Sequence, residues 1–153
     1  MIPEKVRAVL EANGLAALEF EPGSTPTAEL AAARIGVETA RIAKSLLFKD
    51  KSGGYHLVVC PGDKRLSSSA LKRVIGSKVS MTGADETERV TGYRPGGVCP
   101  FALEGVDILI DRELARYPTI YPAAGDDATG VPMSFASLER VTGGRIVDLD
   151  SGC

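Results

Sequence analysis

Histidine and cysteine, the residues that most often build metal sites and catalytic triads, are scarce in this sequence. Its 153 residues include one histidine, His56, so a histidine-based zinc site or a Ser-His-Asp triad is very hard to build. The three cysteines, Cys60, Cys99 and Cys153, are an odd number at wide spacings without a C-x-x-C motif. This pattern argues against a disulfide framework and a cysteine-rich zinc site. We expect neither a metal nor a cofactor, and a zinc hydrolase is close to excluded.

Long apolar segments are absent as well. The longest runs, such as 45–48 and 57–60, span a few residues, far short of the roughly 20 needed to cross a bilayer. The first residues, MIPEKVRAVLEANG, carry scattered charges and lack the apolar core of a secretory signal. We therefore predict a cytoplasmic protein. A chain of 153 residues that is 44% hydrophobic and 25% charged is typical of one globular domain, and we expect residues 1–153 to form it.

Charge is distributed unevenly, although the net charge is only −2. Residues 1–80 contain 12 Lys and Arg against 8 Asp and Glu, whereas residues 81–153 contain 6 against 12. Segment 41–78 is the most basic, with nine Lys or Arg and two Asp. A local positive field on an acidic protein is compatible with a polyanionic partner that touches one face. Charge alone leaves open the alternative of an ordinary solvated surface.

Periodicity and capping residues predict short alternating helices and strands. We expect a helical turn over 37–43, a short helix near 112–116, a helix that ends at Gly36 after the capping segment 24–29, and helices over 3–13, 67–75, 84–91 and 134–141. Strands are expected over 15–21, 45–49, 55–61, 78–81, 106–110, 119–121, 130–133 and 145–149, with 45–61 as a β-hairpin. The lack of long crossover helices favours an α+β fold. It predicts a single compact domain with a mixed, largely antiparallel sheet that is coiled or barrel-like and flanked by short helices.

Two features have the residue types of a binding site. Lys44 lies among apolar residues where a helical turn becomes a strand, so its ammonium either reaches solvent or is fixed at a pocket. There it would hold a phosphate, a carboxylate or a developing oxyanion. The segment Gly96-Gly97-Val98-Cys99-Pro100 combines glycines that permit close backbone approach with a proline that fixes its exit. Such a loop can present N–H groups to a carbonyl or an anion, or can be only a turn.

Several other residues admit both a functional and a structural interpretation. Cys99 invites a nucleophile hypothesis, but no histidine is near it in sequence, so a small packing residue is the better interpretation. His56 is expected in a structural or surface role, Cys60 in the core and Cys153 at a frayed terminus. The acidic pair 126–127 can take part in acid–base chemistry, bind a cation or form a solvated turn.

Four segments occur in an order that resembles a known family. They are 42–49 around the lysine, 91–101 with a Gly-x-x-x-Pro loop, 121–125 and 138–148. Together they resemble the YbaK-type family, the editing domain also found inserted in prolyl-tRNA synthetases, over residues 4 to 149. The resemblance implies a compact mixed α/β domain with a coiled sheet. It also implies a free-standing trans-editing hydrolase that cleaves the ester between a wrong amino acid, here expected to be small, and its tRNA.

The resemblance further implies which residues form the site. The family's lysine falls on Lys44 and its Gly-x-x-x-Pro loop on Gly96 and Pro100; with Gly97, these are the expected catalytic residues. The residues expected to bind substrate are Phe20, Thr25, Val98, Cys99, Ala124, Gly125 and Asp126. The residues expected to contact the tRNA acceptor stem are Arg41, Lys64, Arg65, Lys72 and Arg73.

Such an enzyme can work by positioning its substrate. An aminoacyl ester is already activated and carries a vicinal ribose hydroxyl, which can help to direct water. Backbone N–H groups would hold the carbonyl, and Lys44 would anchor the terminal adenosine or its phosphate. Lys44 is therefore assigned to positioning or charge stabilisation and not to general base catalysis.

Two departures from the family leave the amino acid open. Some members have an aromatic hydroxyl on the strand before the second helix, where this sequence has Phe20. Others have an acid or a histidine after the small-residue loop, where this sequence has Ala128-Thr129-Gly130. Aminoacyl-tRNA is the expected partner and a synthetase a further candidate, whereas neither DNA nor a membrane is expected. Two alternatives remain, a non-catalytic module that binds tRNA or a synthetase, and a nucleotide or metabolite binder that uses the glycine loop.

Overall fold

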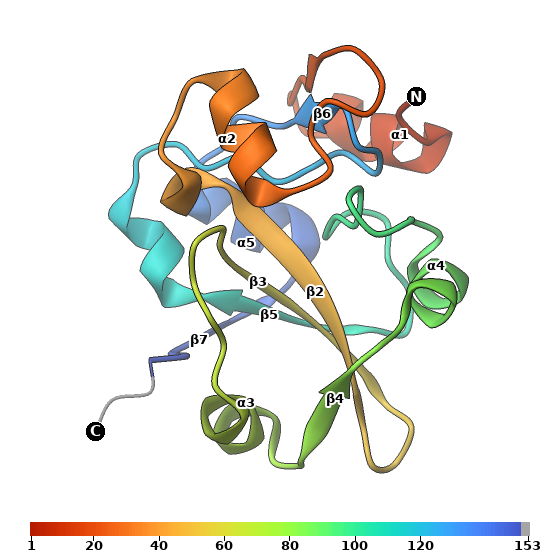
Figure 1. Ribbon diagram of the computed structural model, residues 1–153, viewed down its shortest axis with the longest axis vertical. Helices are drawn as coiled ribbons and strands as arrows, with labels where there is room; N and C mark the ends of the chain where they lie inside the picture. Colours follow the sequence, from red (N-terminus) through yellow and green to blue (C-terminus); the bar gives the residue numbers. More distant parts are fainter. Residues whose placement is uncertain (151–153) are drawn as a thin grey trace.

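A five-stranded mixed sheet forms the centre of the protein, and short helices pack against both of its faces (Figure 1). The computed structural model describes residues 1–150, so the prediction for Cys153 lies outside the described residues. The sheet has the order β4-β2-β3-β5-β7, with strands β2 (Ala43–Asp50), β3 (Tyr55–Pro61), β4 (Val79–Met81), β5 (Asp107–Asp111) and β7 (Arg145–Val147). A separate pair joins β1 (Leu18–Glu19) to β6 (Thr129–Gly130).

The helices follow the predicted capping signals. They are α1 (Glu4–Ala12), α2 (Ala28–Ile35), α3 (Ser68–Ile75), α4 (Ala84–Thr91), α5 (Phe135–Thr142) and the 3₁₀ helices η1 (Thr39–Arg41) and η2 (Arg112–Arg116). The side chains of Thr27, Ser67 and Ser134 accept hydrogen bonds from main-chain N–H groups in the first turns of α2, α3 and α5. Within residues 1–150, the helices are too short or too polar to span a membrane.

The α+β class and the mixed, largely antiparallel sheet are confirmed. Strand pairs β2–β3, β2–β4 and β1–β6 are antiparallel, whereas β3–β5 and β5–β7 are parallel. The five-stranded sheet is open, with β4 and β7 as its edges among the described residues, so the barrel-like alternative does not extend to a closed barrel. Segment 62–106 carries α3, β4 and α4 between β3 and β5, and this length allows a parallel return without one long helix.

Four predicted elements also differ in extent. The expected strands 119–121 and 130–133 are reduced to single bridges, Ile42 with Tyr121 and Ile120 with Met133, and to the two residues of β6. Strand 15–21 is limited to β1, the part that pairs with β6. The helical turn ends at Arg41, so β2 begins at Ala43 and Lys44 lies within the strand.

Side chains alternate across β2 and separate two cores. Ala43 and Leu47 point into the larger core, which includes residues from α1 and α5, whereas Phe48 points into a smaller core that contains Leu71 of α3. Lys44 is opposite Cys60, a member of the smaller core. Because successive residues of a strand face opposite sides, Lys44 lies on the α3 side of the sheet.

The N-terminal half of β2 has an open edge. Strand β4 pairs only with residues 48–50 of β2. On the same outer edge, Ala43 donates its N–H to the carbonyl of Tyr121 (3.1 Å), and the carbonyl of Leu47 accepts from the N–H of Thr82 (3.1 Å). In an antiparallel ladder, every second residue directs its N–H and carbonyl to the same edge. Ser45 therefore directs both groups to this outer edge, where they have no main-chain partner among residues 1–150. This unpaired stretch borders the pocket described below.

His56 has the structural role expected for it. Its Nδ1 lies 2.8 Å from Asp107 Oδ2 at the start of β5, and its Nε2 lies 2.8 Å from Asp50 Oδ2 at the hairpin turn. Carboxylates only accept, so both contacts are hydrogen bonds when each ring nitrogen carries a proton. The ring thus ties β3 to its own hairpin turn and to β5.

We expect this cluster to make stability sensitive to acid. The hydrogen bond from His56 lowers the pKa of Asp50. Burial opposes the charge of Asp107, but Arg145 and His56 outweigh it and lower its pKa. A carboxyl group with a lowered pKa in the folded state stabilises above its unfolded pKa of about 4, and this contribution is lost as the pH falls through the folded value. The melting temperature should therefore fall below about pH 4.

Thermal unfolding followed by circular dichroism between about pH 7 and pH 3 checks this expectation. Asp107→Asn should lower the melting temperature near neutral pH. Its melting temperature should also decrease less steeply as the pH falls, because one titrating carboxylate has been removed. A decrease as steep as that of the wild type would show that Asp107 does not contribute.

Candidate functional site

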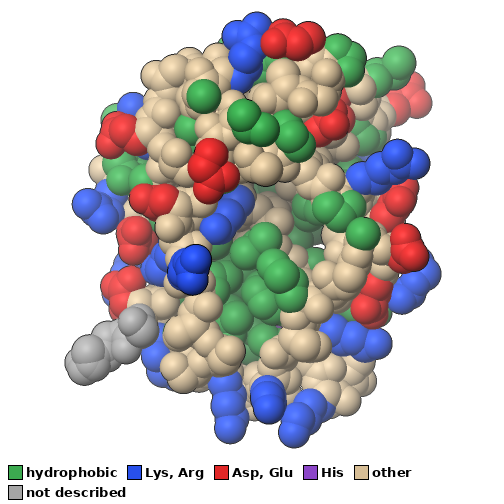
Figure 2. All heavy atoms as spheres, in the orientation of Figure 1, with side chains coloured by type: hydrophobic (Ala, Val, Ile, Leu, Met, Phe, Trp, Pro, Cys, Tyr) green, Lys and Arg blue, Asp and Glu red, His purple; other side chains and the backbone are tan. Residues whose placement is uncertain are grey.

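A pocket of about 370 Å³ lies along the open edge of β2. It is bounded by α2, by the start of α4 and by the loop around Gly96, and residues 42–47 form its floor. Most of the lining is apolar, and hydrophobic side chains gather in a hollow of the corresponding face with Lys or Arg beside them (Figure 2). The volume is in the range of small-molecule sites, which are typically about 300–1,000 Å³.

The polar groups of the pocket are few and mostly neutral. Lys44 is the one Lys, Arg, Asp, Glu or His side chain among the described residues that line it. The Oγ of Ser45 is buried and has no hydrogen-bond partner within residues 1–150. Threonine hydroxyls and the open edge of β2 add further hydrogen-bonding groups. A ligand in this pocket would therefore meet one cation and a set of neutral donors and acceptors.

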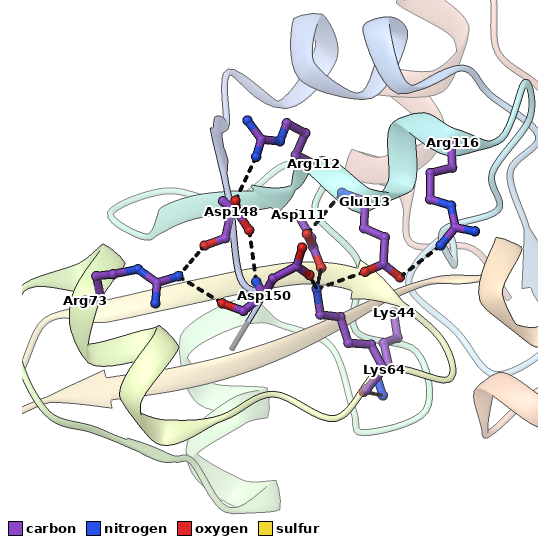
Figure 3. A network of polar contacts seen from close by, with 9 residues as sticks. All are labelled: Lys44, Lys64, Arg73, Asp111, Arg112, Glu113, Arg116, Asp148 and Asp150. Carbon is purple, nitrogen blue, oxygen red and sulfur yellow. Dashed lines mark hydrogen bonds and ion pairs between the residues drawn. The ribbon is translucent and has the colours of Figure 1, made fainter. Parts of the chain in front are cut away.

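The ammonium of Lys44 is held by a main-chain carbonyl. Its Nζ donates a hydrogen bond of 2.8 Å to the carbonyl oxygen of Lys64, in the segment between β3 and α3 (Figure 3). Gly62 begins this segment at a point where an added Cβ would lie 2.5 Å from the carbonyl oxygen of Thr39. The segment is therefore packed tightly beneath η1, and Lys44 is directed to one place at the pocket.

The glycine loop is supported from behind by the loop around Asp126. Gly96 lines the pocket with a φ of +93°, a conformation that favours glycine. A Cβ on Gly97 would lie 2.7 Å from the Cα of Asp126, so only glycine fits against that backbone. The carboxylate of Asp126 in turn binds the amino group of Met1 (2.8 Å) and accepts from the N–H of Ala128. The pocket-facing loop thus rests on a second loop that is itself anchored.

The structure brings some of the predicted site residues together and separates others. Lys44, Gly96, Thr25 and Val98 line the pocket. The lining does not include the other predicted residues of the site, which are Phe20, Gly97, Cys99, Pro100, Ala124, Gly125 and Asp126.

Four of these other residues have contacts that suggest a structural role. The ring of Phe20 packs against the guanidinium of Arg34 (4.6 Å). Cys99 and Ala124 are fully buried in the larger core. A Cβ on Gly125 would lie 2.8 Å from Pro3, on the side of the N-terminus. The contacts of these four residues are thus with other parts of the protein, and their predicted role in binding substrate stays a prediction.

Neither buried cysteine is placed for nucleophilic attack. Burial raises the pKa of Cys99 and of Cys60 to about 12 in each case. The thiolate is the nucleophilic form of cysteine, and it is scarce at neutral pH with such values. Packing is the role that the structure supports for both residues. Among residues 1–150, no group of three or more His, Cys, Asp or Glu side chains is arranged to hold a metal ion.

The predicted tRNA-binding residues divide into engaged and exposed side chains. The ammonium of Lys64 is surrounded by three carboxylates, and Arg41 donates to the carbonyl of Thr119 (3.3 Å). Arg73 donates to the carbonyl oxygens of Asp148 and Asp150. Arg65 and Lys72 are exposed and have no ion-pair partner within residues 1–150. These two residues are the ones free to meet phosphate.

Sequence reasoning missed much of the pocket wall. Ser45, Met81, Thr82 and Thr87 all line the pocket. Ser45 lies in segment 42–49 but was not predicted as a site residue, and the other three lie outside the four segments that carry the resemblance. The sequence did contain one relevant signal. The predicted strand 78–81 is too short to pair along the whole of β2, which pairs with β3 over seven residues. That mismatch leaves part of an edge open, and the open edge borders the pocket.

Comparison with known proteins agrees with this architecture. Residues 22–141 match the model of a family described as the aminoacyl-tRNA editing domain. An uncharacterised Bacillus subtilis protein, YwhH, is 33% identical over 129 residues, which are 84% of this chain and 82% of that protein. An Enterococcus faecalis protein provisionally named Cys-tRNA(Pro)/Cys-tRNA(Cys) deacylase EbsC is 26% identical over 80% of this chain and 76% of that protein.

A solved structure supports the same relationship. It is described provisionally as a trans-editing enzyme for prolyl-tRNA synthetase, and it superposes with a TM-score of 0.84 at 29% identity over 99% of this chain and 100% of that one. The fold and pocket define an α+β domain with a pocket of small-ligand size at a sheet edge. The chain belongs to the aminoacyl-tRNA editing domain family.

Proposed function

We propose that this chain is a deacylase that hydrolyses the ester between a wrong amino acid and the 3′-terminal ribose of its tRNA. One observation carries the proposal. A pocket of small-ligand size places a single fixed cation, Lys44, beside an open strand edge and a glycine loop in a chain of the editing family. The relatives named for deacylation and trans-editing support it.

The chemistry of the pocket favours catalysis by positioning. In the reaction, water adds to the ester carbonyl carbon, the bond to the ribose oxygen breaks, the ribose oxygen gains a proton and the amino acid leaves as its acid. The described lining contains no Asp, Glu, His or Cys to remove a proton from water, so the vicinal ribose hydroxyl of the substrate takes part in directing it. Lys44 stabilises a phosphate of the terminal nucleotide or the developing oxyanion.

The size and surface of the pocket support a small amino acid as the part removed. The volume of about 370 Å³ has to receive the amino acid together with part of the terminal nucleotide. Met81, Leu47 and Val98 occupy the apolar wall, and the described lining has no acid to pair with a basic side chain. Small apolar or weakly polar side chains therefore suit this wall best.

A deacylation panel tests the proposal. The purified chain is incubated with tRNAs charged with alanine, serine, cysteine or other amino acids, and the remaining ester is measured against buffer. We expect at least one small-residue ester to decay well above its buffer rate. If every ester decays at the buffer rate while tRNA still binds, the non-catalytic binding module becomes the better description, and binding to free nucleotide alone would favour a metabolite binder.

The exposed basic residues predict how tRNA affinity responds to salt. Each phosphate contact releases counterions, so losing one lowers the slope of log affinity against log salt by roughly 0.7–0.9. Arg65→Ala and Lys72→Ala should each weaken tRNA binding and reduce the slope by about this amount. Arg145→Ala is the matched control, because Arg145 is already paired with Asp107 (3.1 Å). Unchanged slopes in both variants would remove these two residues from the tRNA surface.

A synthetase is a further candidate partner. The solved relative is named for prolyl-tRNA synthetase, and an enzyme that removes wrong amino acids would act where that synthetase charges tRNA, in the cytoplasm. Co-elution of the chain with a prolyl-tRNA synthetase, with and without tRNA, would establish whether the two bind directly or through their shared substrate.

A further inference from the structure

The side chain of Lys64 is held by three carboxylates and not by solvent. Its Nζ lies 2.7 Å from Asp111, 3.0 Å from Asp150 and 3.2 Å from Glu113, and the side chain is 12% exposed (Figure 3). The Asp111 contact is an ion pair outside hydrogen-bond geometry, whereas the other two are hydrogen bonds. An ammonium surrounded in this way meets a negative field and is not available to a phosphate.

The carboxylates belong to a part of the fold far along the chain from Lys64. Asp111 ends β5 and caps η2 by accepting from the N–H of Glu113 (3.1 Å), and its side chain is 2% exposed. Glu113 lies in η2, and Asp150 follows β7. The Lys64 side chain therefore fastens the segment between β3 and α3 to the parallel half of the sheet.

Gly62 is packed beneath η1 and Leu66 against the smaller core, but Lys64 between them has little main-chain support. Residues 64–67 belong to neither a helix nor a strand, and the N–H of Lys64 donates to the carbonyl of Pro61 (3.0 Å). The carbonyl oxygen of Lys64 accepts a hydrogen bond from the ammonium of Lys44 (2.8 Å). The place of Lys44 at the pocket thus depends on the conformation of a residue whose own side chain is tied down elsewhere.

We propose that Lys64 is a positioning residue, whose side chain, held by Asp111, Glu113 and Asp150, fixes the carbonyl that orients Lys44 at the pocket. This proposal rests on the proposed deacylase function. It replaces the expected phosphate contact of Lys64 with a role inside the protein. In an enzyme that works by geometry, misplacing a fixed group by about 1 Å can cost roughly 100-fold in rate.

The variant that tests this removes both charges of the buried pair. Lys64→Met alone would leave Asp111 buried without its cation, which is strongly destabilising. Lys64→Met combined with Asp111→Asn leaves no uncompensated buried charge, and the asparagine oxygen still accepts from the N–H of Glu113. Arg112→Met is the matched control, because it breaks a neighbouring pair with Asp148 (2.7 Å) that has no contact with Lys44.

Steady-state deacylation of the most reactive ester separates the two roles of Lys64. We expect kcat of the double variant to fall about 10- to 100-fold with little change in KM, while the Arg112 variant keeps its kcat. In a Lys44→Met background the same double change should have no further effect, because Lys64 acts through Lys44. A raised KM with unchanged kcat would mean that Lys64 contacts tRNA, and an equal loss of kcat in both backgrounds would mean a general structural role. Either result would overturn the proposal.

A second readout does not depend on activity. Trace acylation of lysines by an amine-reactive ester, quantified peptide by peptide, should label Lys44 slowly in the wild type and at a rate closer to that of exposed Lys72 in the double variant. Unchanged labelling of Lys44 in a folded double variant would contradict the positioning role even if the chain deacylates nothing. Faster labelling without any wild-type deacylation would instead leave the positioning role standing and contradict the proposed function.

Discussion

Lys44→Met is expected to lower the deacylation rate about 100- to 1000-fold, the usual cost of removing one well-placed electrostatic contact. The methionine keeps the apolar stem against Cys60 and the smaller core but lacks the only charge in the described lining. The variant should fold as the wild type does, because Lys44 is half-buried and gives up one hydrogen bond to Lys64. Single-turnover deacylation together with thermal unfolding measures both effects.

Lys49→Met is the matched control on the same strand. Lys49 is exposed at the hairpin end of β2, and its Nζ pairs with Glu86 (3.3 Å) away from the pocket lining. Its deacylation rate should stay within about threefold of the wild type, since surface pairs of this kind contribute little. If Lys44→Met and Lys49→Met were equally active, the ammonium at the pocket would have no part in the reaction.

Gly97→Ala is expected to lower both stability and activity by pushing two loops apart. The new Cβ would lie 2.7–2.9 Å from three backbone atoms of Asp126, and backbone cannot rotate out of the way as a side chain can. Such overpacking typically costs about 1–3 kcal/mol. Because the displaced loop also carries Gly96 and Val98 into the pocket, deacylation should fall by about 100-fold. Chemical denaturation and single-turnover rates check the two expectations.

Gly83→Ala provides the steric control for this change. Gly83 precedes α4 with an ordinary φ of −76°, and a Cβ there meets no atom within 4 Å. Its stability should change by less than about 0.5 kcal/mol, and its activity should be retained. Wild-type activity in Gly97→Ala would show that the Gly96 loop does not have to lie against Asp126 for the site to work.

Local signals in the sequence were sufficient for most elements and for two parts of the site. The capping residues and glycines of α2, α3 and α5 act within a few residues of the chain, so their boundaries were predicted closely. Lys44 and Gly96 stood out because a lone cation among apolar residues and a glycine-rich loop are unusual in themselves. The structure places both at one pocket.

The long-range pairings were beyond such signals. Nothing near Thr119–Tyr121 in the sequence shows that its main chain would make only single bridges, because this depends on which strands arrive beside it. The same holds for Lys64. Its place in the basic segment 41–78 predicts a surface contact with phosphate, but three acids distant in sequence surround its ammonium.

The sequence by itself determined the class of fold, the helices with their caps, the hairpin and the scarcity of groups that could act as a base. Each of these depends on composition or on neighbours within one turn or one hairpin. Only the tertiary structure decided that segment 119–121 makes single bridges and that Lys64 is held by three carboxylates. Both depend on contacts between segments far apart in the chain. The free energy of such contacts depends on the shapes and charges that meet in the folded protein, which the neighbouring residues in the sequence do not determine.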